Sequence, residues 1–485
     1  MRTPLISLLF LIVVVSVLWG FCNISSFAAP AHPNVILIYS DDQGSLDLGC
    51  YGTPDVRTPH IDSLARRGLR MTQMYAPAAI CSPSRAGLLT GRIPPRAGLT
   101  HNVAYYRGMP GLPSDELTIA KVLQQNGYRT GHFGKWHLGS TKETMPNAHG
   151  FDFSFGHLGG CIDNFSHHFY YAIPHIHDLW LNGEQVWRNG EYFPQIVTDE
   201  SLAFFEECQK KDQPFFAYVA YNVPHYPVQP TDQWREKYMS IQTLDVPLFN
   251  PISKTTFPAY FQGVPSVRGM YLAFIASMDE QVGRIVQKID ELGLRENTII
   301  IFQADQGHSV EDRIMGGGGY TGQYRGHKTS LFEGGIRTPS VVSWPAHLPE
   351  GETRDQLLHA CDWMPTLLSL CGAEVPRDRT IDGMDILPVL KDNAPTPHHV
   401  LYWQAGTTPQ WAVRKDNWKL VAHPIDRTLP LLPEDREYFL VDLAKDPGER
   451  VNLAKSEPEI VAELIRLQET ITQEIQEENR NRKQQ

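Results

Sequence analysis

Hydrophobic residues along the chain fall into two patterns, short apolar runs and longer segments with helical spacing. Four of the runs are rich in β-branched and aromatic residues, at residues 34–40, 128–133, 215–221 and 298–303. Between them, segments such as 118–126 and 270–292 space their apolar residues like amphipathic helices. Short, continuously apolar strands are typical of a parallel sheet that is covered on both faces. The alternation predicts an α/β fold with a large, mostly parallel (mixed) central sheet sandwiched by helices.

The pattern changes after about Asp378. Short strand candidates with aromatic residues follow at residues 400–404, 411–414, 418–422 and 438–443, and turn residues separate them. A final amphipathic segment, residues 458–479, has the pattern of a helix that packs on one face. We therefore expect a large α/β domain over residues 30–378 and a smaller C-terminal antiparallel sheet plus helix over residues 379–485.

The N-terminal segment has the pattern of an export signal. Arg2 precedes an apolar run over residues 5–21, and Ser26-Phe27-Ala28 matches a cleavage site. We expect residues 1–29 to be a signal peptide and the mature chain to be exported. The host then decides between a periplasmic, a secreted and a lysosomal-type location. The apolar run is slightly long, which leaves an uncleaved membrane anchor as the alternative.

The charge distribution argues against two classes of partner. The formal net charge is -11, with acidic and basic residues interspersed. Without a basic stripe the chain cannot replace counterions along a phosphate backbone, so we expect no nucleic-acid partner. No later apolar run approaches the roughly 20 residues that cross a bilayer, so we expect no stable membrane partner. The oligomeric state is not readable from these features.

Polar side chains directly follow each of the four predicted parallel strands. These residues are Asp41 and Asp42, Lys135 and His137, His225, and Asp305 and Gln306. In an open α/β sheet, ligands bind in the crevice beyond the carboxyl ends of the strands. We therefore expect these side chains to converge on one crevice.

Oxygen donors dominate two of these four sets. Asp41-Asp42 and Asp305-Gln306 together offer three carboxylates and one amide oxygen. Such hard donors suit Ca²⁺, with Mg²⁺ also possible, whereas zinc favours His and Cys. Calcium takes roughly 6–8 oxygens, so the substrate and a further protein group would complete its shell. The alternative for Asp41 and Asp42 is an ordinary turn or helix cap after a strand.

The segment Cys81-Ser82-Pro83-Ser84-Arg85 predicts the start of a helix. Pro83 suits the first turn, and Ser82 or Cys81 suits the cap. A group at position 81 would then lie at a helix N-terminus, where the free N–H groups favour an anion. Arg85 follows one turn later on the same face and keeps its charge. The alternative is a capped helix with a buried structural cysteine.

At this point the motifs, taken in chain order, resemble those of the type I, formylglycine-dependent sulfatases of the alkaline phosphatase superfamily. The resemblance is to arylsulfatases and N-acetylgalactosamine sulfatases in particular. The signature is Cys81-Ser82-Pro83-Ser84-Arg85 with Thr90-Gly91-Arg92. The other matching motifs are Asp41-Asp42-Gln43-Gly44, Gly134-Lys135-Trp136-His137-Leu138-Gly139, Pro224-His225, Asp305-Gln306-Gly307-His308, Lys328 with residues 332–339, and residues 438–452.

The resemblance implies an alkaline-phosphatase-like fold and a modified nucleophile. Cys81 would be oxidised to formylglycine by a formylglycine-generating enzyme, and a hydroxyl of its hydrate would attack the sulfur of a sulfate ester. The metal ligands would be residue 81 together with Asp41, Asp42, Asp305 and Gln306. The chain departs from the family at Gln306, where Asn or His is usual. Gln carries the same amide oxygen on a longer arm, so ligation by Gln306 stays an expectation.

The resemblance also implies roles for the basic residues. Arg85 would stabilise the formylglycine hydrate, and Lys135, Lys328 and His225 would bind the sulfate oxygens. Either His225 or Lys328 would protonate the leaving alcohol. His137 would take a proton from the second hydroxyl of the hydrate.

We therefore expect a sulfuric ester hydrolase of the arylsulfatase type, acting on a sulfated small molecule or polysaccharide. Export and abundant Tyr and Trp favour a sulfated carbohydrate, since aromatic rings offer stacking faces to sugars. One alternative is a phosphomonoester or phosphonate hydrolase of the same superfamily. Another is a non-catalytic glycan-binding relative in which Cys81 is unmodified. A thiol hydrolase fits poorly, because it leaves the acidic residues unexplained.

Overall fold

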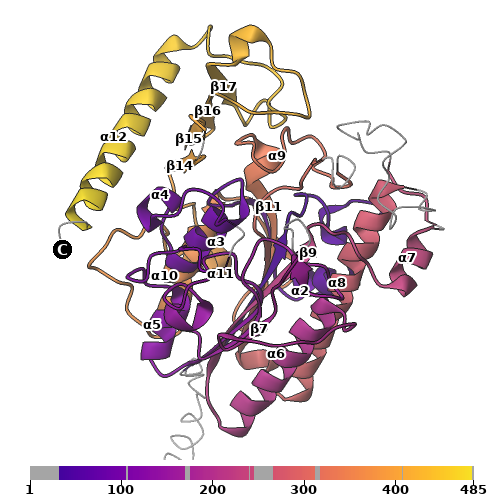
Figure 1. Ribbon diagram of the computed structural model, residues 1–485. Coiled ribbons are helices and arrows are strands. Elements are labelled where there is room, and N and C mark those ends of the chain that lie inside the picture. The colour runs from indigo at the N-terminus through magenta and orange to yellow at the C-terminus, as the bar shows by residue number, and fades with distance from the viewer. Residues whose placement is uncertain are drawn as a thin grey trace, which may run out of the picture.

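A mixed β-sheet runs through the centre of the molecule, with helices on both of its faces (Figure 1). The computed structural model describes residues 32–104, 107–169, 175–239, 241–244, 266–311, 317–406 and 408–482. The predicted signal peptide, residues 1–29, lies outside these ranges. Within them, every helix is too short or too polar to cross a membrane.

The four strands predicted from apolar runs are neighbours in the centre of this sheet. β1 (Asn34–Asp41) lies between β10 (Thr298–Ala304) and β9 (Phe215–Pro224), and β3 (Arg129–Lys135) pairs with the far side of β9. All three pairings are parallel, as the sequence predicts. Their carboxyl ends therefore lie along one edge of the sheet.

Further strands, which the apolar runs did not indicate, extend the sheet on both sides. On the β10 side lie β11 (Arg337–Ser343), which is antiparallel, then β2 (Leu69–Tyr75), which pairs with both β12 (Glu352–Arg354) and β13 (Leu358–His359). On the β3 side lie β4 (Phe153–His157), β7 (Trp180–Leu181) and β8 (Glu184–Gln185). The sheet is thus parallel in its centre and mixed at its borders.

Helices cover the two faces of the sheet and enclose two cores. One core contains α3 (Cys81–Thr90), α5 (Ile119–Gln125), α10 (Trp363–Leu370) and α11 (Leu387–Asp392). The other contains α2 (Pro59–Arg66), α6 (Phe193–Lys210) and α8 (Val267–Glu291). Side chains of β1 alternate between them, with Leu37 in the first core and Ile38 in the second. This explains why the central strands are apolar at consecutive positions.

The remaining elements are short. They are α4 (Pro94–Ala97), α7 (Asp232–Met239), α9 (Glu333–Ile336), β5 (His168–Phe169), β6 (Ile176–His177) and 3₁₀ turns at Gly49–Tyr51, Pro146–His149, Arg295–Asn297, Ala360–Asp362 and Pro433–Asp435.

A second, antiparallel sheet follows, as predicted. It contains β14 (Val400–Gln404), β15 (Trp411–Lys415), β16 (Trp418–Ala422) and β17 (Tyr438–Asp442), in that order. One face packs on α12 (Pro458–Arg482), the yellow helix of Figure 1, through contacts that include Leu440 and Leu464. The other face packs on the main domain, where Trp403 and Phe439 lie in one cluster with Phe332. Both faces of this small sheet are therefore buried.

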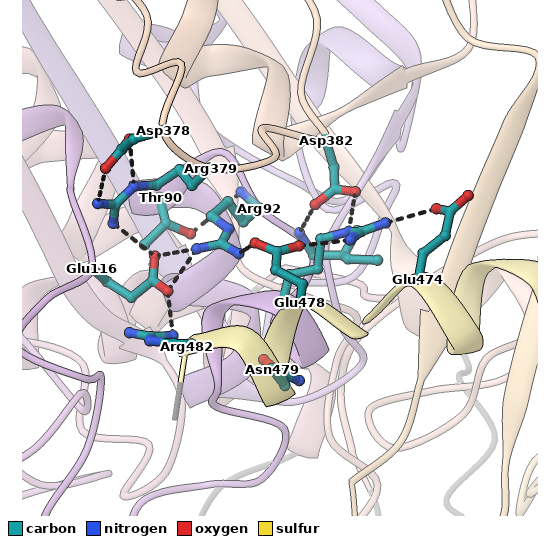
Figure 2. A network of polar contacts seen from close by, with 12 residues as sticks. Thr90, Arg92, Glu116, Asp378, Arg379, Asp382, Glu474, Glu478, Asn479 and Arg482 are labelled. Carbon is teal, nitrogen blue, oxygen red and sulfur yellow. Dashed lines mark hydrogen bonds and ion pairs between the residues drawn. The ribbon is translucent and has the colours of Figure 1, made fainter. Parts of the chain in front are cut away.

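Ion pairs bind the end of α12 to the loop after α3 (Figure 2). Arg92 donates to both carboxylate oxygens of buried Glu116, at 2.8 and 3.0 Å. Arg482, at the end of α12, donates to the same carboxylate at 2.7 Å. Glu478 of α12 accepts hydrogen bonds from Arg92 and, at 2.7 Å, from Arg96 of α4. The C-terminal helix is thus anchored beside the helix that begins with Cys81.

Replacing Glu116 should weaken the whole fold. Glu116→Gln removes a buried charge that bonds Arg92 and Arg482, each of which keeps a second acidic partner, so we expect a loss of about 1.5–3 kcal/mol in the free energy of unfolding. Denaturant unfolding, followed by fluorescence, measures this loss. Glu474→Gln is the matched control, because Glu474 bonds Arg96 from an exposed position in the same network. If both variants unfold at the same denaturant concentration, the buried ion pairs of Glu116 do not stabilise the fold.

Candidate active site

The candidate catalytic residues gather at the carboxyl edge of the central sheet. Asp41 ends β1, Lys135 ends β3, His225 follows β9 and Asp305 follows β10. Asp42 and His137 lie just beyond their strands with positive φ angles of 63° and 58°. Left-handed backbone is uncommon for residues other than glycine, although Asp and His adopt it more often than most. The sharp turns after β1 and β3 are thus part of the site, and the predicted crevice is present.

Cys81 lies at the start of α3 and faces this edge of the sheet. Its Sγ is 3.6 Å from Asp41 Oδ1 and 3.5 Å from Gln306 Nε2, and the side chain is buried. The predicted N-cap residue was wrong, because the structure places the N-cap of α3 at Ile80 and not at Cys81 or Ser82. The physical reason is that Ser82 Oγ accepts a hydrogen bond from the Val103 backbone instead of capping the helix.

Three carboxylates and three cations form buried pairs around Cys81. Lys135 Nζ lies 2.6 Å from Asp41 Oδ2, and Lys328 Nζ lies 2.8 Å from Asp42 Oδ2. The third pair joins Arg85 Nη2 to Asp305 Oδ2 at 2.8 Å. All six side chains are at most 7% exposed. When all six are ionised, the formal charges of the three pairs cancel.

Burial and pairing oppose each other in the pKa values of the three carboxyl groups. Burial raises the pKa of Asp42 to about 6 and that of Asp305 to about 7, although nearby cations act in the other direction. Burial acts likewise on Asp41, but Lys135, His225 and Arg85 outweigh it and hold the pKa of Asp41 well below its usual range. The ammonium of Lys135 is therefore the principal partner of Asp41.

Arg85 is fixed by more contacts than the motif alone indicates. Besides Asp305, its guanidinium donates to the Lys135 carbonyl at 3.2 Å and to the Tyr218 hydroxyl at 3.3 Å. It also lies over the ring of Tyr39, 5.5 Å from the centroid. Tyr39 and Tyr218 are buried on β1 and β9, and sequence reasoning missed them. Their only sign in the sequence was a tyrosine within each otherwise apolar strand, because a buried hydroxyl needs a hydrogen-bond partner.

The two candidate histidines are buried and neutral. Burial holds the pKa of both His137 and His225 well below the usual range, and nearby cations add to the effect. His137 Nε2 is 3.3 Å from the carbonyl of Val103, the residue whose N–H bonds Ser82 beside Cys81. Its Nδ1 has no hydrogen-bond partner in the described part of the chain. That nitrogen is therefore available to accept a proton.

The carboxylates and an amide oxygen of the site fit a hard cation. Side-chain atoms of Asp41, Asp42, Cys81 and His225 all lie within 4.8 Å of one another. Gln306 Nε2 bonds Asp42, while its buried Oε1 has no hydrogen-bond partner among the described residues. An orphaned amide oxygen beside carboxylates is a donor that Ca²⁺ or Mg²⁺ accepts. His225 belongs to this cluster as well, whereas the sequence indicated only a contact with substrate.

Five further histidines, at positions 157, 167, 168, 175 and 177, formed a cluster in the sequence that suited either a substrate-side loop or ordinary polar surface. The structure buries His157, His167 and His177, whereas His168 is half-buried and His175 is exposed. His157 packs against Phe193, and His177 stacks on Trp187 at 3.7 Å between ring centroids.

Comparison with known proteins identifies the family. The family model described as Sulfatase matches residues 33–373, and a model described as the C-terminal region of N-sulphoglucosamine sulphohydrolase matches residues 322–480. The chain belongs to the sulfatase family. The resemblance inferred from the motifs is thereby confirmed.

Named relatives agree with this assignment. The chain is 33% identical to arylsulfatase A of Bos taurus over 475 residues, which covers 91% of this chain and 87% of that protein. It is 34% identical to N-acetylgalactosamine-6-sulfatase of Sus scrofa over 401 residues, which covers 78% of this chain and 70% of that protein. This sulfatase is accordingly a sulfuric ester hydrolase.

Solved structures confirm the alkaline-phosphatase-like fold. The crystal structure of Ps i-CgsB in complex with k-i-k-neocarrahexaose aligns with a TM-score of 0.78 and 29% identity, covering 90% of this chain and 92% of that chain. A phosphonate monoester hydrolase of Agrobacterium radiobacter aligns with a TM-score of 0.61 and 22% identity, covering 92% of this chain and 96% of that chain. The second likeness concerns the fold alone.

Removing one cation from the buried pairs should destabilise the protein. Lys135→Met keeps the length of the side chain but leaves Asp41 without its nearest cation, so we expect a loss of about 3–5 kcal/mol in the free energy of unfolding. Urea unfolding in the presence of a chelator measures it. The control is Lys288→Met, since Lys288 pairs with the half-exposed Glu206 and should leave the midpoint unchanged. If Lys135→Met unfolds at the same urea concentration as the wild type, the ion pair with Asp41 does not stabilise the protein.

Proposed function

We propose that this sulfatase removes sulfate from sulfated carbohydrates, with formylglycine made from Cys81 as nucleophile and with Ca²⁺, or alternatively Mg²⁺, as cofactor. The observation that carries the proposal is the position of Cys81, at a helix N-terminus beside the buried carboxylates of Asp41 and Asp42. A carbohydrate substrate is supported by relatives named for N-acetylgalactosamine and by a related structure that holds a neocarrahexaose.

The cation would be held by the oxygen donors at the ends of β1 and β10. Asp41, Asp42, Asp305 and Gln306 would bind it together with residue 81. When bound, the cation supplies positive charge to the sulfate oxygens and lowers the pKa of a hydroxyl that it contacts. Gln306 fits this role through its unpartnered Oε1.

The basic residues would bind and orient the sulfate. Lys135 and Lys328 are buried, and both lower the pKa of the Cys81 thiol against the raising effect of burial. Together with His225 they would bind the sulfate oxygens, while Arg85 holds the hydrated aldehyde. Positioning and charge neutralisation of this kind provide most of the catalysis in the related phosphoryl transfers.

Proton transfer would fall to the two neutral histidines and to Lys328. His137 has an unpartnered Nδ1 and is tied to the start of α3 through Val103, so it would take the proton from the second hydroxyl at position 81. Either His225, when protonated on Nε2, or Lys328 would give a proton to the leaving alcohol. Both face Asp42, at 3.6 Å and 2.8 Å respectively.

Maturation would involve export and one partner enzyme. Residues 1–29 would direct the chain to a periplasmic, secreted or lysosomal-type compartment. A formylglycine-generating enzyme would convert Cys81. The buried position of Cys81 in the folded chain is consistent with conversion before folding is complete.

Mass spectrometry and a paired assay test the proposal together. The tryptic peptide of residues 71–85 should be about 18 Da lighter than its unmodified form, because conversion of Cys to formylglycine replaces sulfur by oxygen and removes two hydrogens. The same preparation should hydrolyse 4-nitrophenyl sulfate faster than 4-nitrophenyl phosphate, which has the same leaving group.

Two cysteine variants complete this experiment. Cys81→Ala should lower kcat by about 10³-fold or more, the scale of losing a catalytic nucleophile, whereas Cys50→Ala removes a half-buried thiol outside the site and should retain activity. Faster phosphate turnover would favour the phosphomonoester or phosphonate hydrolase. An unmodified thiol without turnover would favour the glycan-binding alternative.

Removing the cation should lower thermal stability. After dialysis against a chelator, CaCl₂ at about 100 times its dissociation constant should add about 2.7 kcal/mol to the free energy of unfolding, because a ligand that binds only the folded state stabilises it. A parallel MgCl₂ titration compares the two cations. Gln306→Ala should shift the titration to higher concentrations, while Gln209→Ala on the exposed face of α6 should not. An unshifted titration for Gln306→Ala would remove Gln306 from the ligand set.

A further inference from the structure

A cavity of about 400 Å³ lies directly beside Lys328. Its walls include Ser309, Glu311, His327 and Arg427. Because Lys328 Nζ bonds Asp42 at 2.8 Å, the cavity adjoins the candidate sulfate site rather than forming an unrelated hollow. Its volume is in the range of sites that bind small ligands, roughly 300–1,000 Å³.

Arg427 is the cation of this cavity that no anion of the described chain neutralises. Its side chain is exposed, and its guanidinium makes no hydrogen bond or ion pair to any residue that the structure describes. In contrast, the cations deeper in the site are paired with Asp41, Asp42 and Asp305. An exposed, unpaired guanidinium on a cavity wall is suited to bind a carboxylate or a sulfate through two parallel hydrogen bonds.

The backbone at Arg427 is fixed relative to Lys328. The Arg427 N–H donates to His327 Nε2 at 3.0 Å, and His327 Nδ1 bonds the Lys328 carbonyl. Both ring nitrogens are therefore used, and His327 is a neutral bridge between the two basic residues. On either side, Asp426 accepts a hydrogen bond from Arg325 at 2.5 Å, and Thr428 accepts one from the Gly326 backbone at 3.3 Å.

We infer that Arg427 determines specificity by binding a second anionic group of the substrate, distinct from the sulfate that is cleaved. This inference rests on the proposed function. The second group is a carboxylate or a further sulfate on the saccharide that occupies the cavity.

The discriminating experiment compares four substrates on the full-length enzyme. They are 4-nitrophenyl sulfate, a monosulfated hexosamine, a disulfated hexosamine and a sulfated disaccharide that contains a uronate. Arg427→Ala should lower kcat/KM by about 10- to 100-fold for the substrates with a second anion, mainly through KM, as expected for the loss of a charge-assisted hydrogen bond. It should leave the other two substrates within about two-fold.

Further variants separate charge from geometry. Arg427→Lys should retain part of the preference, because it keeps the charge and loses the paired donors. Arg436→Ala, an exposed arginine further along the same segment, should behave like the wild type. Comparing the effect of Arg427→Ala on the disulfated hexosamine and on the uronate disaccharide shows whether Arg427 binds a sulfate or a carboxylate.

The outcomes separate this inference from the proposed function. Equal losses on all four substrates would show that Arg427 acts only by positioning Lys328, which overturns the inference and leaves the sulfatase activity in place. If the wild type hydrolyses none of the four substrates, the proposed function fails. A thermal-shift titration with the disulfated hexosamine then still tests whether Arg427 binds an anion. Equal binding to the wild type and to Arg427→Ala would then overturn the inference.

Discussion

Three buried carboxylate–cation pairs at the carboxyl edge of the central sheet are the interaction on which the rest of the structure depends. Each pair joins segments that are far apart in the sequence, such as Asp42 and Lys328 or Arg85 and Asp305. Burying charges is costly unless each has a partner and further hydrogen bonds. The surrounding helices and the second sheet supply the rigidity that keeps these partners within reach, and the result is a compact set of charges able to receive an anion and a divalent cation.

The C-terminal part of the chain supports this edge from the outside. Lys419 of β16 lies 2.9 Å from Glu333 and 3.0 Å from Glu449, and all three side chains are buried. Glu333 begins α9, shortly after Lys328, so this ionic cluster links the small sheet to the segment that carries a candidate sulfate-binding lysine. In addition, α12 contacts the loop after α3 through Arg92. The C-terminal sheet and helix therefore contact two segments of the chain that carry site residues.

The inner and outer parts of the site differ in what they can recognise. The paired lysines and carboxylates around Cys81 suit the reacting sulfate, which every substrate of a sulfatase carries. The part of the cavity wall that includes Arg427 is contributed by a loop of the C-terminal region, and it bonds the segment of Lys328 through His327. Loops on a rigid scaffold are the usual place for substrate preference. In this proposal, catalysis and selectivity would be carried by different elements of the fold.

The sequence by itself determined the strands β1, β3, β9 and β10, the C-terminal sheet with α12, and the residues that follow the strand ends. It did so because continuous apolar runs and helical spacing are local signals, and because the motif order is specific. It missed β2 and β11, where polar residues alternate with apolar ones or a proline interrupts the run. Only the tertiary structure decided that Tyr218 supports Arg85, that His225 joins the donor cluster and that Arg427 stands beside Lys328. These contacts join residues distant in the chain, and no local pattern encodes which of them the folded sheet brings together.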